Sequence, residues 1–257
     1  MTRSFFIGGN WKSNGTLSSV DSLIKGLNAE SWDARVQVVV APIELHLGIA
    51  KQKLNSKIEV AAQNASATGS GAFTGETSAA VLKDFGINWV ILGHSERRTL
   101  FGETDEVVAK KLKACLAAGM KIIACVGETL EQRKSGKTFD VVGKQIDAIM
   151  EAIGQDFKQY ENVVIAYEPV WSIGTGLTAS PTEAEEVHIF IRNRISKATA
   201  PEVSESLRII YGGSVKPDNS TDLMTKENID GFLVGGASLD AKSFAQIANA
   251  PIAANRA

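Results

Sequence analysis

The sequence predicts a single (β/α)8 barrel, in which eight parallel strands close into a ring and helices surround it. Short apolar runs alternate with amphipathic helical patterns along the chain, which is typical of a parallel sheet covered by crossover helices. This alternation repeats eight times in 257 residues, close to the roughly 250 residues of such a barrel. Since no shift in composition marks a linker, we expect one domain over residues 1–257.

The expected strands are short runs rich in β-branched and other apolar residues, as in strands buried on both faces. Proline closes two of them, at Pro42 and Pro169, because it lacks a backbone donor. The strands are expected at Phe5–Asn10, Val36–Ala41, Ile58–Gln63, Trp89–Gly93, Ile122–Val126, Val163–Tyr167, Leu207–Tyr211 and Ile229–Val234.

The expected helices carry apolar residues three and four positions apart. Ser180-Pro181-Thr182-Glu183 reads as a capping box with proline in the first turn, so it opens the helix after the sixth strand. Gly119 is a natural residue to end the helix after the fourth strand. The helical patterns cover 20–27, 45–54, 78–85, 104–118, 142–153, 187–195, 217–226 and 239–248.

The alternative architecture is an open, doubly wound sheet. Such a sheet usually carries a G-x-G-x-x-G turn after its first strand and binds its ligand at one switch point. Here the first strand ends in G-G-N-W-K. The unusual residues are spread over the ends of five strands, which favours a barrel. We expect no cofactor.

Composition and charge are those of an ordinary soluble globular protein, with 44% hydrophobic residues, 22% charged residues and a formal net charge of −2. This charge gives no reason to expect nucleic acid or a membrane as a partner. The N-terminal apolar run breaks at Gly8, so we expect no signal peptide, and no run approaches the roughly 20 apolar residues of a membrane span. Cys115 and Cys125 are isolated, and the three histidines lack metal-ligand spacing. We therefore expect a cytoplasmic protein without a metal site or a disulfide framework.

A carboxylate stands at the end of the sixth expected strand. Glu168 follows Val163–Tyr167, and a buried carboxylate is costly unless it has a partner or a role. The apolar loop Val170–Gly176 follows and could close over it. The stretch is compatible with a base under a lid and equally with a surface glutamate before an ordinary loop.

Other unusual residues also follow expected strands. Asn10 and Lys12 come after the first, His94 after the fourth, Gly212-Gly213-Ser214 after the seventh, and Gly235-Gly236 after the eighth. In a barrel these strand ends meet at one rim. The two glycine pairs would let backbone N–H groups approach a phosphate, helped by a short helix beginning near Ala237. Taken alone, the glycines could merely make tight turns.

His94 precedes Ser95-Glu96-Arg97-Arg98, which could start a helical turn whose N-terminus disfavours the imidazolium. A neutral ring could donate a hydrogen bond to a carbonyl and then shuttle protons. Lys12 would add a positive charge, unless it is a surface lysine or a partner of Glu96. We also expect an ion pair between Arg98 and Glu103. Together these groups indicate proton abstraction next to a carbonyl in a small sugar phosphate.

At this point the sequence resembles the triosephosphate isomerase family over essentially the whole chain. Six segments carry the resemblance, in the order and at the strand ends where the family has them, and together they are highly specific. They are Gly9–Lys12, Gly71–Glu76, Gly93–Arg98, Ala166–Trp171, Tyr211–Val215 and Val234–Ser238.

The resemblance implies roles for the residues at the rim. Glu168 is the base that moves a proton between neighbouring carbons of dihydroxyacetone phosphate, and neutral His94 polarises the carbonyl and relays a proton between the oxygens. Asn10 and Lys12 contact the substrate and stabilise the enediolate, with Glu96 in a supporting position. The resemblance further implies that backbone N–H groups of Gly174, Ser214, Gly235 and Gly236 hold the phosphate, and that Val170–Ala179 closes as a lid latched by the Tyr211 hydroxyl.

The resemblance also implies a homodimer. The loop 64–77 resembles the one that enters the partner subunit, with Phe73 at its tip and Thr74 near the partner's Asn10. A long ordered loop with an exposed ring favours this over a floppy surface loop. Two lid residues depart from the family pattern, Ser172 for the usual Ala and Leu177 for the usual Lys, and the loop before Gly71 is about one residue longer than in common relatives.

Two other functions are compatible with the barrel. A Schiff-base aldolase would need a lysine buried at a strand end in mid-barrel, whereas Lys12 lies beyond the first strand. A binding or structural protein on the same scaffold would have no reason to keep both Glu168 and His94.

Overall fold

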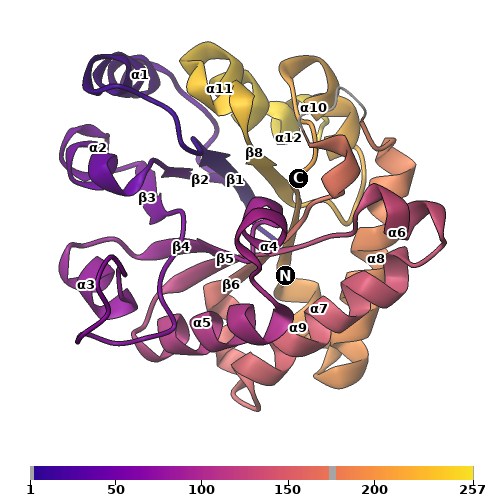
Figure 1. Cartoon of the computed structure of the whole chain (residues 1–257). Coiled ribbons are helices and arrows are strands. Elements are labelled where there is room, and N and C mark those ends of the chain that lie inside the picture. The colour runs from indigo at the N-terminus through magenta and orange to yellow at the C-terminus, as the bar shows by residue number, and fades with distance from the viewer. Residues whose placement is uncertain (1–2, 174–177, 257) are drawn as a thin grey trace.

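The computed structural model describes residues 3–173 and 178–256. Its eight strands are all parallel and pair in sequence order, and the eighth closes on the first, so the predicted (β/α)8 barrel is confirmed (Figure 1). The strands are β1 (Phe5–Asn10), β2 (Val36–Ala41), β3 (Ile58–Ala62), β4 (Trp89–Leu92), β5 (Lys121–Val126), β6 (Val163–Tyr167), β7 (Arg208–Tyr211) and β8 (Gly231–Val234).

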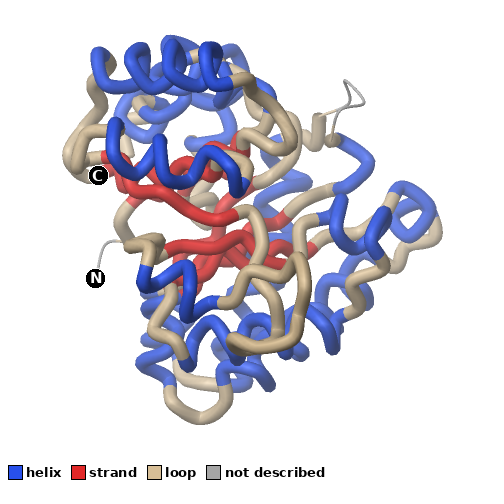
Figure 2. Tube along the Cα trace, turned by 60° about the vertical axis from the view of Figure 1, so that its left-hand side comes forward, coloured by secondary structure: helices blue, strands red, loops and turns tan. Residues whose placement is uncertain are grey.

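Helices form the outer layer around the strands, as Figure 2 shows. They are α1 (Leu17–Ala29), α2 (Leu47–Lys53), α3 (Ala79–Asp84), α4 (Ser95–Phe101), α5 (Asp105–Ala117), α6 (Leu130–Lys134), α7 (Thr138–Ile153), α8 (Pro181–Ala198), α9 (Pro201–Ser206), α10 (Pro217–Met224), α11 (Ala241–Ala248) and α12 (Ala250–Ala253). Short 3-10 helices η1 (Glu44–His46), η2 (Phe157–Asn162), η3 (Val170–Ser172) and η4 (Gly236–Leu239) complete the set. None of the described helices is long and apolar enough to cross a membrane.

The barrel has two apolar layers, because successive side chains of a strand point to opposite faces. In β1, Phe5 and Ile7 pack outward against the helices, whereas Phe6 points into the barrel. There the Phe6 ring lies 5.0 Å from the ring of Trp89. Strands that are buried on both faces explain why the sequence shows continuous apolar runs and no alternation.

Gly231 is required by the closure of the barrel between β8 and β1. Its φ is +142°, and a Cβ at this position would lie 1.9 Å from the backbone oxygen of Phe6. Any side chain there would push β8 away from β1, to which it pairs at Phe6 and Gly231. The sequence pattern placed the strand two residues too early, at Ile229, because Ile229 is also buried.

Candidate active site

The carboxyl ends of five strands meet around one cavity of about 350 Å³. Asn10 ends β1, Lys12 follows it, and His94 and Glu168 follow β4 and β6. The remaining wall consists of glycine-bearing turns after β7 and β8. Residues lining the cavity include Asn10, Lys12, His94, Glu168, Ile173, Gly212, Gly213, Ser214, Gly235 and Gly236.

Glu168 is almost completely buried, with 2% of its surface exposed. One carboxylate oxygen, Oε2, accepts a hydrogen bond of 3.0 Å from the backbone N–H of Ser95, and the other, Oε1, lies 3.0 Å from Nε2 of His94. Gly212 packs against it so closely that a Cβ there would lie 2.8 Å from Cγ of Glu168. Glu168 is therefore a held, partly desolvated carboxylate at the cavity wall and not a surface residue.

His94 caps the N-terminus of α4, where its Nδ1 accepts a hydrogen bond of 3.2 Å from the backbone N–H of Glu96. A ring nitrogen that accepts a hydrogen bond carries no proton, so the neutral ring has its proton on Nε2, facing Glu168. Burial lowers the pKa of His94, but the charge of Glu168 and its hydrogen bond outweigh burial and raise that pKa. Any group that displaces Glu168 from the ring removes this cause. Burial and the charge of Lys12 then favour the neutral form, and only the smaller effect of Glu96 opposes them.

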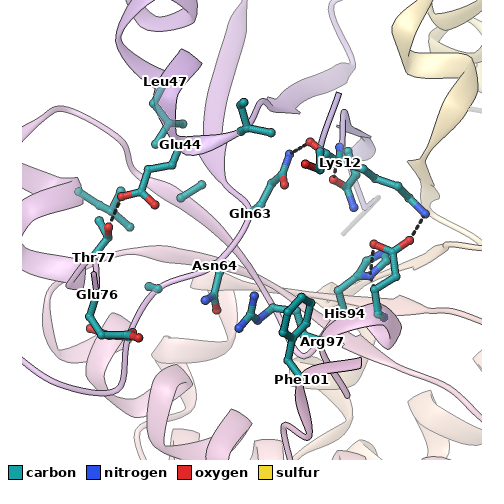
Figure 3. Close-up of a pocket in the computed structure, with 18 of the residues that line it drawn as sticks. Lys12, Glu44, Leu47, Gln63, Asn64, Glu76, Thr77, His94, Arg97 and Phe101 are labelled. Atoms are coloured by element: carbon teal, nitrogen blue, oxygen red, sulfur yellow. Dashed lines mark hydrogen bonds and ion pairs between the residues drawn. The ribbon is translucent and has the colours of Figure 1, made fainter. Parts of the chain in front are cut away.

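Lys12 adopts the left-handed backbone conformation with φ of +53°, which is unusual for a residue with a side chain. Its N–H donates to Oδ1 of Asn10 at 3.0 Å, and its Nζ lies 2.5 Å from Oε1 of Glu96. The pairing with Glu96 is one of the alternatives that the sequence left open for Lys12, and the side chain still lines the cavity. Figure 3 shows Lys12 and His94 reaching toward the same carboxylate, and that carboxylate belongs to Glu96.

Gln63 holds the strained backbone at Lys12 in place, and it was not among the residues predicted to form the site. Its Nε2 donates to the backbone oxygens of Lys12 and Ala41, both at 2.8 Å, and Figure 3 shows the bond to Lys12. The hydrogen bond from the Ser95 N–H to Glu168 could not be predicted from the sequence either, because its donor is a backbone group. A polar residue directly after the buried strand β3 is the one signal that could have pointed to Gln63.

The glycines after β8 face open space. A Cβ at Gly236 would meet no heavy atom within 4 Å, and one at Gly235 would meet only Cε of Lys12 at 3.5 Å. Neither residue has a positive φ. The ψ of Gly235 is −112°, which lies outside the regions that residues with a side chain favour, so its backbone conformation also calls for glycine. The open space beside both residues leaves room for a ligand. The 3-10 helix η4 begins at Gly236, close to the expected Ala237.

Ser172 and Tyr211 are fully buried and lie over the backbone of Gly213. A Cβ at Gly213 would be 2.1 Å from the Tyr211 hydroxyl and 2.5 Å from that of Ser172. Neither hydroxyl makes a well-aligned hydrogen bond among the described residues. Burial raises the pKa of Tyr211, and the nearby Ser172 hydroxyl and Ala179 backbone oppose that rise. Two other residues expected at the lid, Gly174 and Leu177, lie outside the described residues.

The expected ion pair between Arg98 and Glu103 is wrong. Glu103 instead pairs with Arg97 and, at 2.6 Å, with Lys111, while Arg98 lies 2.6 Å from Asp105. Arg98 also donates to the backbone oxygen of Gly93. Successive residues of a helix point about 100° apart, so Arg97 and Arg98 of α4 reach different partners.

A second cavity of about 460 Å³ adjoins the first and shares Asn10, Lys12 and His94 with it. Figure 3 shows its other walls, with Thr77 and Glu44 bonded to each other on one side and Arg97 and Phe101 on the other. The loop 64–77 borders it and is closed by a hydrogen bond of 2.9 Å from the Ser66 N–H to the Thr77 oxygen. Phe73 on this loop is 45% exposed.

Comparisons with known proteins agree with the resemblance seen in the sequence. The family model "Triosephosphate isomerase" matches residues 5–251. The cytosolic triosephosphate isomerase of Oryza sativa subsp. japonica is 54% identical over 242 residues, which cover 93% of this chain and 94% of the relative. The chloroplastic triosephosphate isomerases of Fragaria ananassa and Secale cereale are 50% and 51% identical, over 97% and 95% of this chain and 78% and 81% of the relatives.

Proposed function

The chain belongs to the triosephosphate isomerase family and interconverts dihydroxyacetone phosphate and D-glyceraldehyde 3-phosphate, and we propose that Glu168 and His94 carry this reaction. The observation that supports the assignment best is the contact of 3.0 Å between Glu168 Oε1 and His94 Nε2 at the cavity wall. A base and a proton donor this close can serve two neighbouring atoms of one substrate.

In the proposed mechanism, Glu168 removes a proton from the carbon next to the carbonyl. The C–H electron pair forms the carbon–carbon double bond, and the carbonyl electrons move to oxygen, giving an enediolate. His94 polarises that carbonyl through Nε2–H, gives its proton to the oxygen, and takes the proton of the neighbouring hydroxyl. Glu168 then returns its proton to the other carbon, so the enzyme ends as it began.

Charge and backbone groups around the cavity support the remaining roles. Lys12 is the cation at the rim, and it stabilises the enediolate together with Asn10. Glu96 positions Lys12 through the contact of 2.5 Å between them. The N–H groups of Ser214, Gly235 and Gly236 bind the phosphate, and the open space at the two glycines supports this. The role inferred for Gly174 rests on the family alone.

We further propose that the segment Val170–Ala179 closes over the substrate, latched by Tyr211. Its described flanks lie at the cavity, since Ile173 lines it and Ser172 packs beside Tyr211 over Gly213. Closure would exclude water and strengthen the electrostatics around the enediolate.

The variants Glu168→Gln and His94→Ala test the two central roles. A general base contributes roughly 10²–10⁴ in rate, so each variant is expected to lose at least about 100-fold in kcat. Both should still bind a phosphate-bearing analogue, because the glycine turns are intact. Near-normal turnover in either variant would remove the role assigned to that residue.

A Schiff-base aldolase on the same barrel remains the competing reaction. Its lysine would have to attack the substrate carbonyl, and Lys12 and Lys216 are the lysines that line this cavity among the described residues; of the two, Lys12 follows the strand end next to His94 and Glu168. Borohydride treatment with dihydroxyacetone phosphate should leave the protein's mass unchanged. Covalent capture at Lys12 would favour the aldolase.

We also propose that two copies form a homodimer through the loop 64–77. Phe73 is 45% exposed, and Phe101, at the wall of the second cavity, is 66% exposed. A cavity beside an apolar loop tip gives each copy a place for the other's Phe73. Thr74 would then lie near the partner's Asn10, which completes the site in trans.

Sedimentation of Phe73→Asp tests this interface. The variant should be monomeric at micromolar concentration and weakly active, whereas Phe157→Asp, which changes a ring that is 36% exposed in η2, should stay dimeric. A dimeric Phe73→Asp would contradict the proposal.

The compartment proposed is the cytoplasm, with the reaction serving glycolysis and gluconeogenesis. Cys115 and Cys125 are buried free thiols, which suits a reducing compartment. Relatives are named for both the cytosol and the chloroplast, so a fluorescent fusion of the full chain should decide between them.

A further inference from the structure

The turn between β7 and α10 carries one of the backbone groups assigned above to the phosphate, the N–H of Ser214. It runs from Gly212 to Lys216, and all five of its residues line the cavity. A backbone N–H binds an anion well only if the chain holds it in the right direction before the ligand arrives. The hydrogen bonds of this turn therefore bear on the affinity for the phosphate.

The first half of the turn does not fix the direction of the Ser214 N–H. The N–H of Gly212 donates to the backbone oxygen of Tyr167 on β6 at 2.7 Å, which holds the start of the turn. After it, the N–H groups of Gly213 and Ser214 have no hydrogen-bond partner in the part of the chain that the structure describes. Glycine restricts its own backbone rotation least of all residues. The direction of the Ser214 N–H thus depends on what holds the second half.

Asn219 holds the second half of the turn with one side-chain amide. It lies in the first turn of α10 and reaches back, so that its Nδ2 donates to the backbone oxygen of Ser214 at 2.9 Å. Its Oδ1 accepts a hydrogen bond of 2.8 Å from the N–H of Lys216. The two bonds hold the peptide groups on both sides of Val215, whose side chain is buried in the core. A polar clamp and an apolar anchor therefore fix this end.

We propose that Asn219 is a positioning residue that keeps the N–H of Ser214 directed at the phosphate. Asn219 is not among the described residues that line the cavity, so it acts through the turn and not on the ligand. A residue that only capped α10 would need an acceptor alone, whereas an asparagine amide also supplies the donor that holds Ser214. The inference rests on the proposed phosphate site, and it adds a residue to which the family resemblance gave no role.

The variant Asn219→Ser tests the clamp with the least disturbance to α10. At the same position of α1, the hydroxyl of Ser19 accepts a hydrogen bond of 2.9 Å from the N–H of Thr16. A hydroxyl at position 219 can therefore still accept from the N–H of Lys216, but it is too short to reach the oxygen of Ser214 as well. Asn219→Ala removes both bonds and leaves no polar group that could replace them.

Both variants are compared with the wild type in two measurements. The first is the affinity for 2-phosphoglycolate, and the second is proton exchange of D-glyceraldehyde, which has the carbonyl but lacks the phosphate. We expect each variant to weaken 2-phosphoglycolate binding by about three- to ten-fold, the range that corresponds to one hydrogen bond. Exchange on D-glyceraldehyde should not change, because no phosphate is present to use the Ser214 N–H.

Asn28→Ala is the matched control. Asn28 lies on α1 and is half-buried, as Asn219 is. It makes the same pair of bonds, since its Nδ2 donates to the backbone oxygen of Lys53 at 2.7 Å and its Oδ1 accepts from the N–H of Asn55 at 2.8 Å. It lines neither of the two cavities described above. This variant should lose thermal stability as Asn219→Ala does, but bind 2-phosphoglycolate as the wild type does.

The outcomes separate the role of Asn219 from the function of the protein. Wild-type affinity for 2-phosphoglycolate in either Asn219 variant would overturn the role of Asn219. So would an equal loss of exchange on D-glyceraldehyde, or an equal loss of affinity in Asn28→Ala, because the damage would then be general. A wild type that does not isomerise triose phosphates would instead overturn the proposed function.

Discussion

His188 is fully buried on α8, and its two ring nitrogens are in different surroundings. Nδ1 lies 2.9 Å from the backbone oxygen of Asn228 and donates to it, whereas Nε2 has no hydrogen-bond partner among the described residues. The edge of the ring meets Tyr167, with the ring centres 5.9 Å apart. A second proton would place a positive charge in this fully buried site, where the charge of Arg192 also disfavours it.

These surroundings lower the pKa of His188 from 6.5 to about 3, chiefly through burial, with the charge of Arg192 acting in the same direction. Since the unfolded chain keeps an ordinary histidine pKa, it binds the extra proton first, and the free energy of unfolding falls as the pH drops below about 6.5. Between pH 7.5 and pH 5 the loss from this one group is about 2 kcal/mol, and it reaches about 4 kcal/mol at pH 3.

Urea unfolding of the wild type and His188→Gln at pH 7.5 and pH 5 measures this loss. Protein concentration is held constant, because a dimer's stability depends on it. The variant can be less stable at both pH values, but its stability should fall by about 2 kcal/mol less than that of the wild type between them. Equal losses in the two proteins would refute the argument that His188 stays neutral in the fold.

Three further changes test the site and its support. Gln63→Met removes two hydrogen bonds from the strained loop at Lys12, each worth about 1 kcal/mol, so kcat/KM should fall by up to about 30-fold, and an unchanged value would show that the loop holds itself. In an NMR titration, the pKa of His94 should be lower in Glu168→Gln than in the wild type, because the charge that raises it is gone; equal values would contradict that cause. Ser172→Ala removes a buried hydroxyl that makes no well-aligned hydrogen bond among the described residues, so thermal unfolding should show a gain of about 1 kcal/mol, whereas a loss would reveal a hydrogen bond made by that hydroxyl.

The barrel could be predicted from the sequence because each strand is buried on both faces. A short run of apolar residues such as Val163–Tyr167 is typical of a strand that is buried on both faces, and all five of its residues are buried in the structure. The helices α6 and α9 were not predicted. Each has only five or six residues, too few for an apolar stripe to repeat, and tertiary contacts hold them in place.

The residues at the rim could be selected from the sequence because strand ends converge in a barrel. Glu168 and His94 do come together there, although which atoms face each other depends on the hydrogen bond from Glu96 to the ring. The contacts of Gln63 and of the Ser95 N–H could not be predicted, since they join segments far apart in the chain. The choice between Arg97 and Arg98 as the partner of Glu103 depended on the exact start of α4.

The central claim is that Glu168 and His94 transfer a proton through an enediolate. Proton NMR of dihydroxyacetone phosphate in D₂O with this protein tests it most directly. We expect D-glyceraldehyde 3-phosphate to appear with deuterium at carbon 2. Exchange into the remaining substrate without any aldehyde would mean that the base works and the relay through His94 does not. No exchange at all would contradict the claim and leave only the fold.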